Sequence, residues 1–264
     1  GVRSMSASEW AGKHLGERTI SYDNRDAILY ALSVGATRDD LDLIFEDRLR
    51  VLPTFGLTLA QWAPDILAEA GVFDHRSVHG SQVLDVHAPL PREGEIALNA
   101  RVGNVWDKGA AAVFEVVVES TYFTATWAIF APGAGGFGGE RGPKAVTAER
   151  AGEPRRLSLQ TTPTQAVLYR LTGDRHHIHV DPEASAKIGQ PVPILQGLCT
   201  IAAATLPIAA SLGAHPADLT HLAGRFAGPV VPGDALDIDL WADGAFEALH
   251  GDDVVISAGE VAFA

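Results

Sequence analysis

Residues 27–33 read AILYALS and residues 166–172 read AVLYRLT, and the match between these two stretches decides the fold. Four of the seven positions are identical, and two of the others are conservative exchanges, Ile28 for Val167 and Ser33 for Thr172. The offset between the stretches is 139 residues. A chain that resembles itself at a fixed spacing is typical of a duplicated structural unit.

Two further matches follow in the same order. Gly56-Leu57 corresponds to Gly197-Leu198 at an offset of 141 residues, and each pair opens an apolar stretch that a proline, Pro64 or Pro207, is expected to end or kink. Gly94 in PREGEI corresponds to Gly233 in VPGDAL at an offset of 139 residues. Three matches in one order at nearly one spacing indicate an internal duplication.

Each copy shows the same succession of patterns. A short amphipathic helix is expected at 24–34 and at 164–171, and a longer apolar helix at 57–70 and at 198–212. Strands with alternating apolar residues are expected at 83–87, 96–105, 112–119 and 121–130, and again at 219–227, 236–242 and 254–264. The order predicts an α+β unit in which an antiparallel sheet wraps an apolar helix.

The copies set the expected domain boundaries. Residues 1–22 are expected to form an N-terminal tail, in which residues 1–4, before the only methionine, Met5, are a cloning remnant. The first unit would span 23–150 and the second 151–264. From about residue 131 to 163 the composition favours a linker, including GAGGFGGERGP. Residues 133–138 fit G-x-G-x-x-G, but glycines and a proline follow where a dinucleotide site needs a helix, so we reject such a site.

Composition excludes other classes of protein. The 264 residues carry 20 basic and 33 acidic side chains, for a net charge of −13, and no basic run offers a nucleic-acid surface. The stretch 194–212 is uncharged but Ala-rich and interrupted by Gly and Pro, so it predicts a buried helix and no membrane span. The single cysteine, Cys199, excludes an intrachain disulfide and favours a reducing compartment, and there is no apolar signal segment, so we expect a cytoplasmic protein.

The densest polar cluster is TGDRHHIHVDP at 172–182. Asp174 and His179 on one loop can converge on one water molecule, as general acid–base catalysis requires. The backbone N–H of Gly197, at the start of the apolar helix, can bind a developing oxyanion. The alternatives are structural: Asp174 as a turn cap and His179 as a surface residue.

Metal binding is a further alternative, because His176, His177, His179 and Asp181 all carry ligand atoms. Their spacing matches no closed zinc pattern and no cysteine assists, so no metal is expected.

The two copies differ at the candidate site. At the 139-residue offset, Asp174 corresponds to Gly35 and His179 to Asp40, so only the second copy has the acid–base pair. Cys199 lies in an apolar stretch that disfavours a thiolate, which predicts a core residue and no nucleophile. Several cations can contact an anionic ligand, although each alone reads as a surface charge: Arg25, Arg170, Arg175, Lys187 and Arg225.

Residues 169–200, YRLTGDRHHIHVDPEASAKIGQPVPILQGLCT, resemble the signature of the MaoC-like, type 2 (R-specific) enoyl-CoA hydratases, Y-R-L-S-G-D-x-N-P-L-H-x-D-P followed by P-I-L-H-G-L. YDNRDAILYALSVGA, VLPTFG, HGSQ, GAGGFGG-RGP and RFAGPVVPGD also look like family segments in family order. The resemblance implies a double hotdog fold, assembled as a homodimer. It also implies Asp174 and His179 as catalytic residues, Gly197 as the oxyanion donor, and cofactor-free hydration of trans-2-enoyl-CoA to (3R)-3-hydroxyacyl-CoA.

The sequence departs from that signature at three positions. His176 stands for the family Asn, His177 for the Pro, and Gln196 for the His before the oxyanion glycine. We expect the hydratase chemistry to be kept with an altered substrate preference or pH profile. Substrate contacts are expected from His176, His177, Gln196, Gly56, Arg170 and Arg225, with the acyl tail held by the first copy.

Two other functions stay open at this point. One is a non-catalytic protein that binds acyl thioesters, and the other is a thioesterase on the same fold. The carrier of the acyl group can be CoA or an acyl carrier protein.

Overall fold

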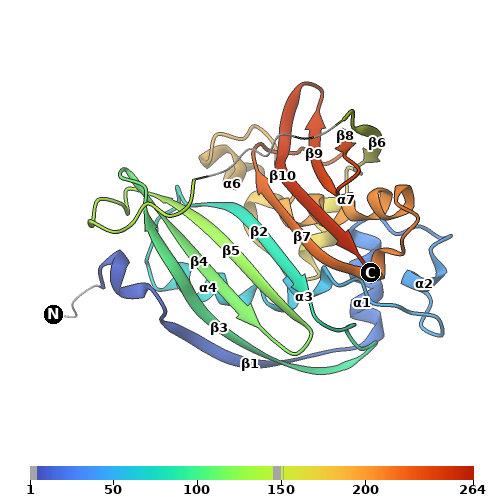
Figure 1. Cartoon of the computed structure of the whole chain (residues 1–264), viewed down its shortest axis with the longest axis horizontal. Helices are drawn as coiled ribbons and strands as arrows, with labels where there is room; N and C mark the ends of the chain where they lie inside the picture. The colour runs from blue at the N-terminus through green and yellow to red at the C-terminus, as the bar shows by residue number, and fades with distance from the viewer. Residues whose placement is uncertain (1–4, 145–149, 151) are drawn as a thin grey trace.

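The computed structural model describes residues 5–144, 150 and 152–264, so the proposed remnant at 1–4 and part of the proposed linker lie outside it. Ten strands form one antiparallel sheet with the order β1-β3-β4-β5-β2-β7-β10-β9-β8-β6 (Figure 1). The strands are β1 (His14–Tyr22), β2 (Val78–Val86), β3 (Gly94–Asp107), β4 (Ala111–Glu119), β5 (Phe123–Pro132), β6 (Arg155–Gln160), β7 (Leu219–Phe226), β8 (Ala235–Leu240), β9 (Ala245–His250) and β10 (Asp253–Phe263).

The strand order confirms the duplication. Strands β1 to β5 are arranged 1-3-4-5-2, and β6 to β10 repeat that arrangement in reverse from the centre of the sheet. The two halves meet where β2 pairs with β7, with Ser81 opposite Arg225 and Asp85 opposite His221. The architecture is therefore a double hotdog of α+β class, as predicted.

The helices lie on one face of the sheet (Figure 1). They are α1 (Asn24–Ser33), α2 (Leu41–Ile44), α3 (Phe55–Leu59), α4 (Trp62–Glu69), α5 (Gln165–Arg170), α6 (Pro182–Lys187) and α7 (Gly197–Ser211), with 3-10 turns η1 (Ala7–Trp10), η2 (His177–His179) and η3 (Pro216–Asp218). No helix among the described residues is long and apolar enough to cross a membrane.

The two apolar helices differ although their sequences match. The stretch predicted as one helix over 57–70 is two helices, α3 and α4, separated at Ala60 and Gln61. Pro64 explains the break, because a proline ring clashes with the carbonyl four residues earlier, here that of Ala60. Pro207 lies inside α7, which continues to Ser211 and does not end at the proline.

Both edge strands were missed. Residues 14–22, predicted as part of a tail, form β1 and pair with β3, and residues 155–160, predicted as linker, form β6 and pair with β8. In β1 the apolar residues do not alternate regularly. In β6 they do, but the strand has only 6 residues and borders a stretch rich in Gly, Pro and Arg, so neither segment identifies itself clearly as a strand. Strand β9 was also missing from the prediction.

The glycine-rich stretch after β5 is a loop, as predicted, and Asp107 at the end of β3 organises it. The Asp107 carboxylate accepts hydrogen bonds from the backbone N–H groups of Gly109, Gly136 and Gly138, at 2.8–2.9 Å. These bonds lower the pKa of Asp107 to about 2. The loop amides thus bind a carboxylate of the same chain.

Candidate active site

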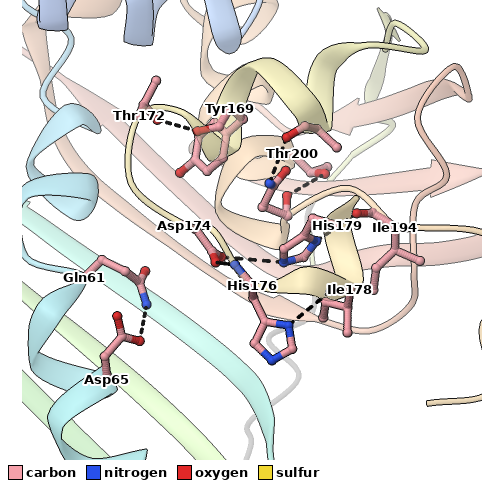
Figure 2. A network of polar contacts seen from close by, with 12 residues as sticks. Gln61, Asp65, Tyr169, Thr172, Asp174, His176, Ile178, His179, Ile194 and Thr200 are labelled. Atoms are coloured by element: carbon pink, nitrogen blue, oxygen red, sulfur yellow. Dashed lines mark hydrogen bonds and ion pairs between the residues drawn. The ribbon is translucent and has the colours of Figure 1, made fainter. Parts of the chain in front are cut away.

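The loop after α5 folds Asp174 back against His179 through a short series of local hydrogen bonds. The Asp174 carboxylate accepts from the backbone N–H of His176 at 3.1 Å, and the His176 Nδ1 accepts from the N–H of Ile178 at 3.2 Å. The second bond caps η2, and that turn directs His179 toward Asp174 (Figure 2). The motif TGDRHHIH therefore determines its own geometry.

His179 is fixed in one tautomer. Its Nδ1 lies 2.8 Å from the carbonyl oxygen of Ile194, which can only accept, so Nδ1 carries the proton. Nε2 lies 3.6 Å from Oδ2 of Asp174. When the imidazole is neutral, these two atoms are both acceptors, and a water molecule can donate one proton to each. The His179 side chain is 8% exposed and that of Asp174 26%, so the pair is sheltered but open on one side.

The charges around the pair favour an ionised Asp174. Burial raises the pKa of this carboxyl, but attraction to His179 and the hydrogen bond from the His176 N–H outweigh burial and lower it. Desolvation of the His176 ring, together with the neighbouring His179, lowers the pKa of His176. The Asp174 carboxyl is therefore ionised near neutral pH, and the neighbouring His176 ring is neutral there.

Gly197 begins α7 with a free backbone donor. Among the described residues, no carbonyl or side chain accepts a hydrogen bond from its N–H. A Cβ at this position would meet the ring of Phe226 at 2.9 Å, so a side chain does not fit here. The corresponding Gly56 is buried, and its N–H donates to the carbonyl of Pro53 at 3.0 Å. Of the two corresponding glycines, both within the described residues, Gly197 has an open N–H and Gly56 does not.

The structure places only some of the residues predicted to contact the substrate near Asp174 and His179. Gln196 is buried and its Nε2 donates to the carbonyl of Ala166 at 3.1 Å, which anchors α7 to α5. His177 is exposed on η2. The Nε of Arg170 is buried, and no described residue accepts a hydrogen bond from it. Arg225 precedes Phe226 on β7, and since neighbouring residues on a strand face opposite ways, it lies on the other face of the sheet from Gly197. The structure does not bring Arg225 or the N–H of Gly56 to the site.

Sequence reasoning missed two residues that face the loop of Asp174, namely Gln61, which precedes α4, and Asp65 within α4. Gln61 and Asp65 lie across from Asp174 and His176 in Figure 2, and Gln61 Nε2 donates to Asp65 Oδ1 at 3.5 Å. The pKa of Asp65 is raised, because partial burial and the charge of Asp174 outweigh the hydrogen bond from Gln61. They lie more than 100 residues before the motif, so no local spacing could indicate them.

His79 was missed as a neighbour of this site. A β-bulge between His79 and Ser81 turns its ring inward, 4.7 Å from the Phe226 ring that packs on Gly197. Its Nε2 is buried and has no hydrogen-bond partner among the residues that the structure describes. Burial lowers the pKa of His79 to about 4, so this imidazole is neutral near neutral pH. The segment HGSQ was visible in the sequence, but the inward direction depends on the bulge.

Cys199 is fully buried in α7, and burial raises the pKa of its thiol, which confirms the prediction of a core residue. In the part of the chain that the structure describes, no group of three or more His, Cys, Asp or Glu side chains could hold a metal ion.

The matches to known families divide the chain into the same two halves as the sheet does. Residues 20–131 match the MFE-2 hydratase 2 N-terminal domain, and residues 146–259 match the MaoC like domain. A Mycobacterium tuberculosis protein named enoyl-CoA hydratase ChsH3 is 37% identical over 254 residues, which cover 88% of each chain. The chain belongs to the MaoC-like hydratase 2 family.

Other members support this assignment. The 3-hydroxyacyl-thioester dehydratase Y of M. tuberculosis is 34% identical, over 91% of this chain and 89% of that protein. A MaoC-like dehydratase from Phytophthora capsici superimposes with a TM-score of 0.84 over 96% of both chains, and at 24% identity this likeness shows the fold alone. The peroxisomal multifunctional enzyme type 2 of Drosophila melanogaster has a TM-score of 0.78 at 28% identity, over 94% of this chain and 48% of that one.

Proposed function

We propose that this MaoC-like hydratase 2 family member catalyses the reversible addition of water to trans-2-enoyl-CoA, which gives (3R)-3-hydroxyacyl-CoA. The observation that carries the proposal is the placement of Asp174 Oδ2 3.6 Å from His179 Nε2, on the loop that leads to the open N–H of Gly197. The names of the M. tuberculosis relatives, an enoyl-CoA hydratase and a 3-hydroxyacyl-thioester dehydratase, agree with this chemistry.

The mechanism uses one water molecule and no group outside the chain. The water donates to Asp174 and His179, and its oxygen attacks C3 of the enoyl group while one of its protons passes to the pair. Negative charge develops on the thioester oxygen, where the N–H of Gly197 stabilises it. The pair then returns one proton to C2. Asp174 and His179 act together in both proton transfers.

The non-catalytic unit would hold the acyl tail. The break between α3 and α4 interrupts the helix that is continuous in the catalytic unit. His176 and His177 lie on the exposed side of the loop at 172–179, which we call the catalytic loop. They are therefore placed to contact the carrier end of the thioester. Gln196 would act indirectly, by anchoring the start of α7 through Ala166.

We further propose that the chain functions as a homodimer in the cytoplasm, with CoA as the acyl carrier. The family resemblance supports the dimer, and the single cysteine supports a reducing compartment. Light scattering coupled to size-exclusion chromatography tests the dimer. Turnover of crotonyl-CoA against crotonyl-acyl carrier protein tests the carrier.

The decisive assay is the loss of the enoyl-thioester ultraviolet absorbance when purified protein is added to crotonyl-CoA and longer enoyl-CoAs. Hydration by the wild type and its loss in Asp174→Ala are expected. Absence of hydration across all chain lengths, or full activity in Asp174→Ala, would overturn the proposal. Release of free thiol from a saturated acyl-CoA would indicate a thioesterase, and calorimetric binding without turnover would indicate a binding protein.

A further inference from the structure

A cavity of about 400 Å³ lies beside the catalytic loop. Its walls come from β1, α1, α3 and α4, and it reaches Leu171–Gly173, the three residues directly before Asp174. Its lining is mixed: side chains such as Leu29, Phe55 and Leu59 supply apolar surface, and polar groups supply at least as much. The volume lies within the range of small-molecule sites. We call it the α4 cavity.

The polar side of this lining comes from β1, from α4 and from Gln61, the residue that precedes α4. Gln61 and Asp65 line the cavity and are joined by the 3.5 Å hydrogen bond between their side chains. Arg18 also lines it, with its guanidinium 4.7 Å from the centre of the Trp62 ring. Figure 2 shows Gln61 and Asp65 across from Asp174, so the polar side of the cavity faces the catalytic loop.

These groups fit poorly with a purely aliphatic ligand. An alkyl chain in the α4 cavity would remove water from the Asp65 carboxylate and the Gln61 amide without replacing its hydrogen bonds, which is unfavourable. Partial burial and the charge of Asp174 raise the pKa of Asp65 even though Gln61 and Arg18 act to lower it, so the carboxylate would gain from a further hydrogen-bond donor. A hydroxyl group would supply them, because it donates to a carboxylate and accepts from an amide N–H.

We propose that the α4 cavity is a substrate subsite that binds a hydroxyl group on the acyl chain, remote from the thioester. Asp65 accepts a hydrogen bond from this hydroxyl and Gln61 Nε2 donates one to it. A carboxylate at the same position on the acyl chain is disfavoured, because Asp65 carries the same charge. This subsite rests on the proposed hydratase function and narrows its substrate class to hydroxylated enoyl thioesters.

The test compares acyl chains that differ only in the remote group. Wild-type kcat/KM is measured for trans-2-octenoyl-CoA, for its 8-hydroxy analogue and for its analogue with a terminal carboxylate, together with shorter and longer homologues of each. At the chain length that reaches Asp65, the hydroxylated substrate is expected to exceed the alkyl one by about tenfold, as for one hydrogen bond to a charged group. Equal kcat/KM for hydroxyl and methyl at every length overturns the subsite.

Variants assign the preference to α4. Asp65→Leu is expected to reverse it in favour of the alkyl substrate, whereas Asp65→Asn should keep part of it and accept the terminal carboxylate. Glu69→Leu removes a carboxylate one turn further along α4, outside the cavity lining, and should leave the preference unchanged. The same preference in Asp65→Leu as in the wild type contradicts the assignment, and the wild-type panel decides if that variant does not fold.

Binding separates this proposal from the hydratase function. Calorimetry with octanoyl-CoA and 8-hydroxyoctanoyl-CoA, together with their homologues, needs no turnover and is expected to show tighter binding of the hydroxylated ligand. If the enoyl-CoAs are not hydrated, the proposed function fails while this comparison still decides the subsite. If they are hydrated without any hydroxyl preference, the subsite fails and the function stands.

Discussion

Replacement of Gly197 by alanine tests the oxyanion donor. The new Cβ would meet carbons of the Phe226 ring at 2.9–3.2 Å, and the ring or the start of α7 must retreat by about 0.5 Å to reach the 3.4 Å at which ordinary contact begins. A shift of that size equals the positional tolerance of a catalytic group. We expect kcat to fall on the order of 10²-fold, as when an oxyanion donor is lost. Because the lost interaction belongs to the transition state, kcat/KM should fall equally with crotonyl-CoA.

The duplication supplies a matched control. A Cβ on Gly56 would meet the Phe123 ring at 2.7 Å, an equally severe clash, but the Gly56 N–H is already bound to Pro53. Both alanine variants should lose about 1–3 kcal/mol of stability by overpacking. Only Gly197→Ala should lose kcat in the folded protein. An unchanged kcat in Gly197→Ala, or the same loss in Gly56→Ala, would refute the role of the Gly197 N–H.

Four further predictions concern charge. Asp174→Asn should lower kcat by about 10²–10⁴-fold, the range for a general acid–base group, with folding checked by thermal melting; near wild-type kcat would contradict its role. Because the pKa of His176 is lowered, its ring stays neutral through the ordinary histidine range and takes up a proton only at more acidic pH. His176→Asn should therefore flatten the acid side of the kcat profile, and an unaltered profile would count against this. The pKa of Asp107 is lowered to about 2 in the folded protein, so its hydrogen bonds stabilise the fold above pH 3.8, its unfolded value, and are lost as pH falls toward 2. The urea midpoints of the wild type and Asp107→Asn should therefore differ at neutral pH and converge in acid. A difference that stays constant with pH would exclude this linkage. Asp85 and Glu260 raise the pKa of His221 despite its burial, so its ion pairs stabilise the fold below the unfolded histidine pKa and are lost as pH rises through the raised value. The difference in melting temperature between the wild type and His221→Gln should therefore shrink at alkaline pH. A larger difference there would contradict the prediction.

The sequence was informative where chemistry and repetition are local. The paired stretches at 27–33 and 166–172 predicted two units, and the arrangement of the sheet confirms them. Asp174 and His179 were predicted from one loop, because hydrogen bonds within that loop bring them together. Short-range patterns can be read from sequence when the contacts that satisfy them are also short-range.

What the sequence did not indicate depends on tertiary contacts. Strand β6 lies in a stretch whose Gly, Pro and Arg content predicts a linker, and the alternation in RRLSLQ is too short to outweigh that composition; its pairing with β8 is a tertiary contact. His79 faces inward only because of a bulge, and Asp65 approaches Asp174 only through the packing of one unit against the other. Gly197 and Gly56 occupy the same place in the repeated Gly-Leu pair. Only the backbone geometry distinguishes the open N–H of Gly197 from the hydrogen-bonded N–H of Gly56.

The pairing of β2 with β7 has a consequence for the order in which the molecule folds. Residues joined there, such as Ser81 and Arg225, are far apart along the chain, whereas the other pairings join strands of the same half. Contacts of long sequence separation are slow to form, so we expect each half to collapse on its own before the halves dock. Asp65 and Asp174 come from different halves, so their approach would be among the last events of folding. Catalytic competence is then expected to lag behind secondary structure during refolding.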